Sequence, residues 1–462
     1  MRRITNRAVS VLLIAAMVIC GMVVYVLRYI DHGQDWALYF SRANSGSTGQ
    51  IYDRRGTSLA YFSGYENLFA ADEWTREANY HVTGDYWGRT GTGVLSSFWD
   101  DMQGFDLING TTQAEHSVLH LNIDAELNKL IYARLCRLYK PTDENAATQY
   151  DENGNEITTP REVYNAAVLV CNYRTGELLG MVSMPTVDPL EAEGEVAEGA
   201  YINRCLSATF VPGSVFKLVT AAAALESIPT LKGEGFFCEG KVEIAGVPIT
   251  CKTAHGEQTF EQALANSCNC TFAQLAVCVG QNTMADYARM YGFLDRQSLD
   301  GIPTAAGNYP TEFVGDPETG WSGIGQSTDL VCPYSMLRFV CAVANGGILA
   351  EPKLINDGRA PVYERFMDAG TADYLKQLMS YTAETAYNAE HSFPGLKICA
   401  KTGTAEVGDG TSNAWFVGFL DDEEHPYAFV TMIERGGGGL TTAGSVTNKY
   451  LQDYMDFLNG KE

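Results

Sequence analysis

Positive charge is scarce in this sequence. Its 462 residues contain 32 lysines and arginines against 56 aspartates and glutamates, which gives a formal net charge of −24. Nucleic acids and anionic membrane surfaces attract basic proteins, so neither is expected to be the main partner. The chain also lacks a repeat with a period of about 20 to 50 residues, which excludes solenoids and propellers.

The twelve cysteines include no Cys-x-x-Cys pair, so neither a zinc ribbon nor a thioredoxin-like motif is indicated. Cys268 and Cys270, with His255 nearby in sequence, form an incomplete ligand set, because a structural zinc ion takes four ligands. We therefore expect no metal and no cofactor. Cys238 and Cys251 flank an expected hairpin, and a disulfide between them stays open as an alternative to two free thiols.

Charge is absent from one long apolar run near the N-terminus, residues 8–27. About 20 apolar residues span the hydrocarbon core of a bilayer. Three arginines precede the run and one follows it, which favours an N-terminus inside the cell. We predict a cytoplasmic tail over residues 1–7, a single transmembrane helix over 8–29 and an extracytoplasmic remainder. A cleaved signal peptide is disfavoured because its apolar region is normally shorter.

Residues 45–165 contain no paired catalytic groups. Residues 51–60 predict a strand, a turn and a second strand, and the apolar spacing in residues 123–139 predicts an amphipathic helix with Asp124 near its start. We expect this part to be a non-catalytic pedestal or dimerisation-type domain.

Long apolar strands begin at residue 166. Two strands are expected early, over residues 166–172 and 177–184, and three late, over residues 397–404, 414–420 and 427–433. A terminal amphipathic helix is expected over residues 447–458. This order predicts that residues 166–462 form an α+β domain, in which one antiparallel sheet is flanked by helices.

A nearly all-apolar helix is predicted directly after Ser214, and Lys217 is one of its few polar residues. The two residues are three apart, which places their side chains on one helix face. An amine without solvent has a lowered pKa and can accept the proton of a serine hydroxyl, which makes the serine a nucleophile. The alternative is an N-cap serine followed by a lysine that reaches solvent.

A second candidate site lies on a late strand, in Lys401-Thr402-Gly403-Thr404. Side chains alternate along a strand, so Lys401 and Gly403 share one face. We expect the missing side chain of Gly403 to let a substrate backbone approach and pair with the strand.

Three motifs occur in the order Ser214-x-x-Lys217, Ser267-x-Asn269 and Lys401-Thr402-Gly403, and this set characterises penicillin-binding proteins and class A β-lactamases. The chain resembles the class B penicillin-binding proteins, the monofunctional peptidoglycan D,D-transpeptidases, over nearly its whole length. Shared stretches include Ile51-Tyr-Asp-Arg-x-Gly56, Leu121-Asn-Ile-Asp124, Arg174-Thr-Gly-Glu177, Gly323-Ile-Gly-Gln326 and Ala414-Trp-Phe-Val-Gly418. Ser327 and Asn413 depart from the family pattern, at positions where glycine and histidine are common.

The resemblance implies the fold of the penicillin-binding and serine β-lactamase-like transpeptidases, with a five-stranded sheet. It implies that Ser214 attacks a stem peptide between its terminal D-alanines and that Lys217 takes the proton. Backbone N–H groups of Ser214 and Thr404 would hold the oxyanion. It further implies that Ser267 and Lys401 relay a proton to the leaving D-alanine, that Asn269 holds the substrate amide, and that Thr402 and Thr404 bind the terminal carboxylate.

The partners implied by the resemblance are stem peptides ending in D-Ala-D-Ala, β-lactam antibiotics and a separate multi-spanning membrane glycosyltransferase. A D,D-carboxypeptidase, which transfers the acyl group to water, stays open as an alternative, and so does an inactive scaffold of the cell-wall machinery. A β-lactamase is disfavoured because it needs no membrane-proximal spacer. The sequence does not distinguish division, elongation and sporulation.

Overall fold

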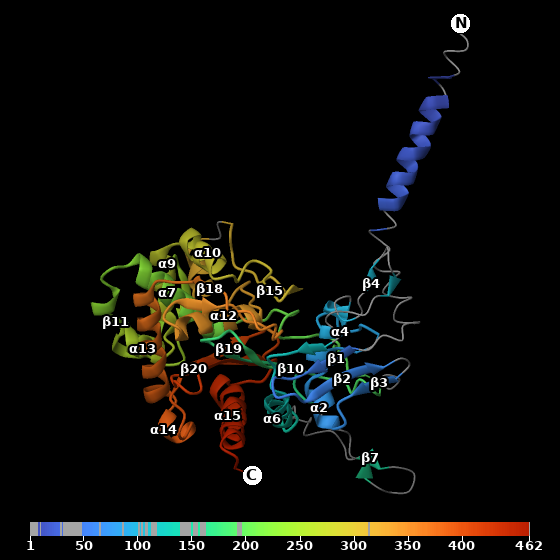
Figure 1. Ribbon diagram of the computed structural model, residues 1–462. Helices are drawn as coiled ribbons and strands as arrows, with labels where there is room; N and C mark the ends of the chain where they lie inside the picture. Colours follow the sequence, from blue (N-terminus) through green and yellow to red (C-terminus); the bar gives the residue numbers. More distant parts are fainter. Residues whose placement is uncertain are drawn as a thin grey trace. The chain divides into compact units, whose positions relative to one another are not determined.

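The computed structural model (Figure 1) describes residues 8–9, 11–27, 30, 49–63, 66–85, 87–99, 102, 105–106, 110–111, 118–138, 149–150, 156–157, 163–191, 196–312 and 315–461. The chain divides into two compact units, Met1–Thr48 with Phe62–Asn67, and Gly49–Tyr61 with Leu68–Glu462. All three candidate motifs lie in the second unit.

The N-terminal residues 8–9 and 11–27 are helical. Within the described ranges no helix has both the length and the apolar character that crossing a membrane requires. The predicted span over residues 8–29 therefore stays a prediction, and the predicted tail over residues 1–7 lies outside the described residues.

A five-stranded antiparallel sheet lies at the centre of the second unit and confirms the predicted α+β domain with one antiparallel sheet. Its order is β10-β9-β21-β20-β19. The strands are β9 Ala166–Asn172, β10 Leu178–Met184, β19 Ile398–Glu406, β20 Ser412–Leu420 and β21 Tyr427–Ile433. Because β19 is an edge strand, one of its sides is not paired within the sheet.

Helices cover both faces of this sheet, which explains why its strands are apolar along their whole length. The C-terminal helix α15, Ser445–Leu458, presents Tyr450, Leu451 and Tyr454 to one face. Helix α12, Pro333–Ala344, is buried along its length and packs on β9, β20 and β21, on the other side of the sheet in Figure 1.

The segment between the early and late strands carries most of the helices and several short strand pairs (Figure 1). Its first part comprises the 3-10 turn η1 Gly213–Phe216, α7 Lys217–Ser227, η2 Leu231–Gly233, β11 Gly235–Cys238, β12 Lys241–Ile244, β13 Val247–Thr250, β14 Gly256–Thr259, α8 Phe260–Ala265 and α9 Asn269–Val279. Its second part comprises α10 Gln281–Met290, β15 Ser298–Leu299, β16 Ile302–Pro303, α11 Asp316–Ser322, α12, β17 Ile348–Ala350, β18 Tyr363–Arg365, α13 Ala369–Ala386 and α14 Ala389–Ser392. The π-helical turn η3, Gly439–Gly444, follows the late strands.

The N-terminal part of the chain forms a second sheet, in the order β3-β2-β1-β6, with helices beside it. Its elements are β1 Gly49–Tyr52, β2 Ser58–Ser63, β3 Glu66–Phe69, α2 Glu73–Ala78, α3 Tyr80–Thr83, α4 Val94–Ser97, β6 Val118–His120 and α6 Ala125–Leu135. Two isolated pairs are β4 Phe105–Asp106 with β5 Gly110–Thr111, and β7 Gln149–Tyr150 with β8 Glu156–Ile157. The predicted strand–turn–strand and the amphipathic helix are confirmed.

Two carboxylates hold these elements together, and one of them also reaches the C-terminal helix α15. Asp124 caps α6, and its Oδ2 accepts hydrogen bonds from Arg55 Nε at 2.7 Å and from the Tyr454 hydroxyl at 2.8 Å. Asp53 accepts from the Thr57 backbone N–H at 2.6 Å and from the Ala125 N–H at 3.1 Å. The residues on either side of position 165 therefore belong to one compact unit, and the division into pedestal and catalytic domains stays a prediction.

Candidate active site

Ser214 lies in a tight turn at the start of the buried helix α7. The turn η1 is a 3-10 helix, and the α-helix proper begins at Lys217. From Lys217 to Ala224 every residue of α7 is buried, as the apolar sequence predicts. Ser214 itself is half-buried, so its hydroxyl can meet a substrate at the end of the helix.

The Lys217 amine is fully buried and meets four oxygen atoms. It donates to the backbone O of Ser267 at 2.6 Å and to Asn269 Oδ1 at 2.7 Å. Its Nζ also lies 3.0 Å from Ser214 Oγ and 3.1 Å from Ser267 Oγ. A neutral amine has two N–H groups and one lone pair. The two carbonyl oxygens accept hydrogen bonds from both N–H groups, so the lone pair can accept a hydrogen bond from a serine hydroxyl.

Lys401 of the third motif, on the edge strand β19, completes this group of side chains. Lys401 Nζ lies 3.1 Å from Ser267 Oγ and donates to the Thr402 carbonyl at 3.1 Å. Ser267 thus lies between two buried lysines, in contact with both amines. The structure therefore brings Ser214, Lys217, Ser267, Asn269 and Lys401 together, as the family resemblance implies.

Burial decides the charge of these amines. Desolvation lowers the pKa of Lys217 to about 7, and nearby thiols of Cys251, Cys268 and Cys270 oppose this shift in part. The pKa of Lys401 is lowered well below its usual range by burial and by the neighbouring Lys217 charge. Lys217 is thus a base that is partly unprotonated at neutral pH.

The resemblance implies that penicillins acylate Ser214, and we predict that this acylation depends on pH through Lys217. Only the unprotonated amine accepts the serine proton, so the second-order acylation rate should fall as pH drops below about 7. Stopped-flow measurements between about pH 5 and 9 would show this profile. A rate that is flat over this range would contradict the role of Lys217. So would a rate that keeps rising up to about pH 9, as for an amine with the ordinary lysine pKa of about 10.4.

Gly403 is needed within the fold itself, while the predicted approach of a substrate backbone stays a prediction. A Cβ at this position would lie 2.7 Å from the Pro212 carbonyl oxygen and 3.1 Å from Val215 Cγ1. The missing side chain therefore lets β19 lie against the turn that carries Ser214. The predicted alternation is confirmed, because Lys401 and Gly403 are both buried.

Gly403→Ala is predicted to reduce both stability and acylation. The added methyl must push β19 away from η1, and overpacking of this kind costs about 1–3 kcal/mol. Urea unfolding and the penicillin acylation rate would measure the two effects. Gly235→Ala is the matched control, since a Cβ there meets nothing within 4 Å. Equal behaviour of the two variants would contradict the close-approach argument.

The two threonines of the third motif differ in their surroundings. Thr404 is exposed, and its Oγ1 accepts from the Gly439 N–H at 3.2 Å. Thr402 contacts Tyr387, whose hydroxyl accepts from the Thr402 N–H at 2.9 Å and lies 3.1 Å from Thr402 Oγ1. Sequence reasoning missed Tyr387, because it lies after α13 without any motif beside it.

The two departures from the family pattern have structural contacts. Asn413 is buried, and its Oδ1 accepts from the Arg435 backbone N–H at 3.1 Å. Ser327 has a positive φ of 72°, and its hydroxyl contacts Glu318. Asn413 therefore supports the chain turn after β21.

Comparison with known proteins identifies this arrangement. Residues 166–456, more than half of the chain, match the family described as penicillin binding protein transpeptidase domain. The chain belongs to this family. Its relatives are class B penicillin-binding proteins, which confirms the predicted resemblance.

Two curated relatives show how similar this chain is to characterised penicillin-binding proteins. Stage V sporulation protein D of Bacillus subtilis (strain 168) is 27% identical over 371 residues, which cover 74% of this chain and 54% of the relative. Peptidoglycan D,D-transpeptidase PbpA of Mycobacterium tuberculosis (strain CDC 1551 / Oshkosh) is 26% identical over 319 residues, which cover 60% and 63%. The chain thus spans between about half and two thirds of the length of these relatives.

A solved structure confirms the transpeptidase fold. Penicillin-binding protein A from M. tuberculosis, as a ceftriaxone acyl-enzyme complex, has a TM-score of 0.72 at 21% sequence identity. The match covers 88% of this chain and 98% of that chain.

Proposed function

We propose that this chain is a peptidoglycan D,D-transpeptidase, which cross-links stem peptides through a Ser214 acyl-enzyme and is a target of β-lactams. The observation that carries the proposal is the buried Lys217 amine, 3.0 Å from Ser214 Oγ, with both of its N–H groups taken by carbonyl oxygens. Support also comes from the PbpA relative, which is named a peptidoglycan D,D-transpeptidase.

Acylation begins when Ser214 Oγ bonds to the carbonyl carbon between the two terminal D-alanines and its proton passes to Lys217 Nζ. The C–N bond then breaks, and the leaving amine of D-alanine takes up a proton. Ser267 lies between both lysines, so the proton can pass from Lys217 through Ser267 Oγ, with Lys401 holding that hydroxyl. An amine of a second stem peptide attacks the ester carbonyl, forms the cross-link and restores Ser214.

The edge strand β19 is suited to hold the donor peptide. Because one side of β19 is unpaired, an extended peptide can add to it through main-chain hydrogen bonds.

We assign stabilisation of the oxyanion to the backbone N–H groups of Ser214 and Thr404, since each donor of this kind typically lowers the barrier by about 3 kcal/mol. The exposed Thr404 hydroxyl and Thr402 are suited to the terminal carboxylate of the substrate. Asn269 accepts from Lys217 and donates to the Thr250 carbonyl at 2.8 Å, which supports a role in holding Lys217. Its role in holding the substrate amide rests on the family resemblance.

The proposal places the enzyme at the cell membrane. The uncharged run over residues 8–27, with more arginines before it than after it, supports a single span with the N-terminus inside. An alkaline phosphatase fused after residue 45 should be active, because that enzyme needs the oxidising extracytoplasmic side. The family resemblance supports a multi-spanning glycosyltransferase as partner, which co-purification from membranes would reveal.

The proposed activity is tested by incubating the full chain, in detergent, with a peptide ending in D-Ala-D-Ala and an acceptor amine. Release of D-alanine together with a new amide to the acceptor is the expected result. Release of D-alanine with hydrolysis alone would identify a D,D-carboxypeptidase, and no release from a correctly folded protein would favour the inactive scaffold.

A further inference from the structure

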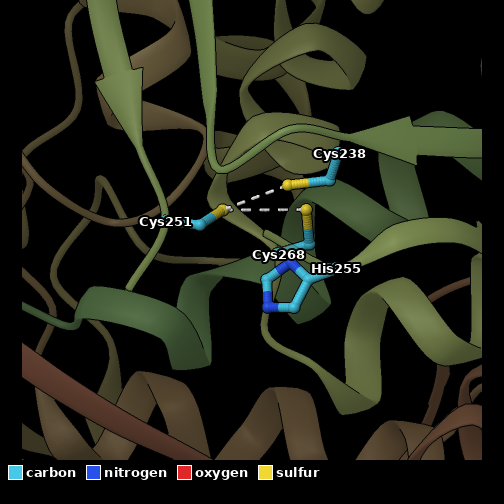
Figure 2. A group of neighbouring side chains, drawn as sticks. All are labelled: Cys238, Cys251, His255 and Cys268. Atoms are coloured by element: carbon cyan, nitrogen blue, oxygen red, sulfur yellow. Dashed lines mark hydrogen bonds between the residues drawn. The ribbon is translucent and has the colours of Figure 1, made fainter. Parts of the chain in front are cut away.

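Three cysteines and one histidine gather beside the second motif. The sulfur atoms of Cys238, Cys251 and Cys268 and a ring nitrogen of His255 all lie within 4.8 Å of one another. Figure 2 shows the three sulfur atoms turned toward one another with the imidazole beside Cys268. Cys238 ends β11, Cys251 follows β13, His255 precedes β14, and Cys268 caps the N-terminus of α9.

The spacing of the sulfur atoms fits a tetrahedral metal ion. Cys251 Sγ lies 3.8 Å from Cys238 Sγ and 3.8 Å from Cys268 Sγ. A tetrahedral ion with metal–sulfur bonds of about 2.3 Å places its sulfur ligands about 3.8 Å apart. All of these cysteines are free. Cys251 Sγ also lies 3.5 Å from Cys270 Sγ, so it has three thiol neighbours and no single disulfide partner.

The histidine supplies independent evidence. His255 Nδ1 is buried and has no hydrogen-bond partner in the part of the chain that the structure describes. An unpaired buried nitrogen is costly, and coordination to a metal removes that cost. The ring is held in position by its own backbone, whose N–H donates to the Cys238 carbonyl at 3.1 Å.

Backbone N–H groups point at the sulfur atoms, as they do where thiolates need stabilisation. Cys251 Sγ accepts from the N–H groups of Asn269 at 3.2 Å and Cys270 at 3.4 Å. Cys238 Sγ accepts from the Gly240 N–H at 3.4 Å. The cluster therefore carries a second shell suited to negative sulfur.

We propose that Cys238, Cys251, His255 and Cys268 bind a structural zinc ion that fixes the loop of the second motif. The predicted absence of a metal rested on a set of Cys268, Cys270 and His255, and folding adds Cys238 and Cys251 from the strands before it. Four protein ligands leave no open position, so the site is structural. On binding, the three thiols release three protons to solvent and the imidazole binds as the neutral ring; no electron is transferred.

A zinc ion bound by Cys268 would also fix two active-site residues, because Cys268 lies between Ser267 and Asn269 in the chain. Ser267 has a φ of +51°, a left-handed conformation that is unfavourable for a non-glycine residue. Bonding Cys268 to an ion shared with the β11–β14 strands holds this conformation. Ser267 and Asn269 then stay in reach of Lys217.

The test is the metal content of the full chain, purified in detergent without chelator. We expect about one zinc per chain by plasma mass spectrometry, and a cobalt-exchanged protein with the visible bands of a tetrahedral thiolate site. Cys268→Ser and His255→Ala should lose the ion. Cys278→Ser should keep it, because Cys278 is exposed on α9. Cys270→Ser should keep it too, because Cys270 Sγ, although 3.5 Å from Cys251 Sγ, does not belong to the four ligand atoms that all lie within 4.8 Å of one another.

A folded wild-type chain that holds no zinc, or that shows a disulfide among these cysteines by mass spectrometry, would overturn the proposal. Loss of zinc in Cys270→Ser with retention in Cys268→Ser would overturn the ligand set. Wild-type metal content decides the matter even if a variant fails to fold. The zinc proposal does not rest on the transpeptidase assignment. A protein that binds zinc but is not acylated by penicillin would contradict the transpeptidase assignment and leave the zinc site standing.

Discussion

Ser214→Ala protein is expected to show no covalent labelling by a fluorescent penicillin, whereas the wild-type chain is labelled. The variant removes the only oxygen that the proposed mechanism esterifies. Its fold should persist, because Ser214 is half-buried in the turn before α7 and loses a single hydroxyl. Gel fluorescence with the full chain measures the labelling, and thermal unfolding measures the fold.

Ser227→Ala serves as the matched control, since Ser227 ends the same helix at an exposed position. It should be labelled like the wild type, with a change in unfolding free energy within about 0.5 kcal/mol. Equal labelling of Ser214→Ala and wild type would show that another residue is the nucleophile.

Lys217→Met is expected to lower the acylation rate by about 10²–10⁴-fold, the usual contribution of a positioned general base. Methionine fills a similar apolar volume but cannot accept the Ser214 proton. The protein should remain folded. The variant loses hydrogen bonds to Ser267 and Asn269, but it also removes the desolvation cost of burying an amine. The second-order rate constant for penicillin acylation measures the effect.

Lys397→Met tests whether loss of any nearby lysine has the same result. Lys397 is exposed directly before β19, so its replacement should leave the rate within a factor of about two. A Lys217→Met rate close to the wild-type value, in a folded protein, would remove Lys217 from the mechanism.

Much of the catalytic fold could be predicted because its signals are local. The five central strands are long apolar runs, and the helix after Asp124 follows from apolar spacing and a capping carboxylate. Within the site, Ser214 with Lys217 and Lys401 with Gly403 follow from the periods of helix and strand. That all three motifs meet in one place was expected from the family resemblance, since no local pattern predicts contacts between segments so far apart.

The remaining features depend on contacts between distant segments, which no local pattern encodes. Tyr387 meets Thr402 across 15 sequence positions, at the end of an ordinary helix. Gly403 is required by the carbonyl of Pro212, far earlier in the chain. The cysteine cluster forms because β11 and β13 bring Cys238 and Cys251 to Cys268. Cys278 lies in an apolar run of the sequence but is exposed, because the end of α9 is not fully covered.

The central claim is that the Ser214 hydroxyl, with Lys217 as its base, forms the acyl-enzyme. The most direct measurement is peptide mapping by mass spectrometry of the full chain after reaction with benzylpenicillin. We predict one penicilloyl group, attached to the peptide that contains Ser214 and located on its side-chain oxygen. An adduct on any other residue, or a folded protein that carries none, would contradict the account.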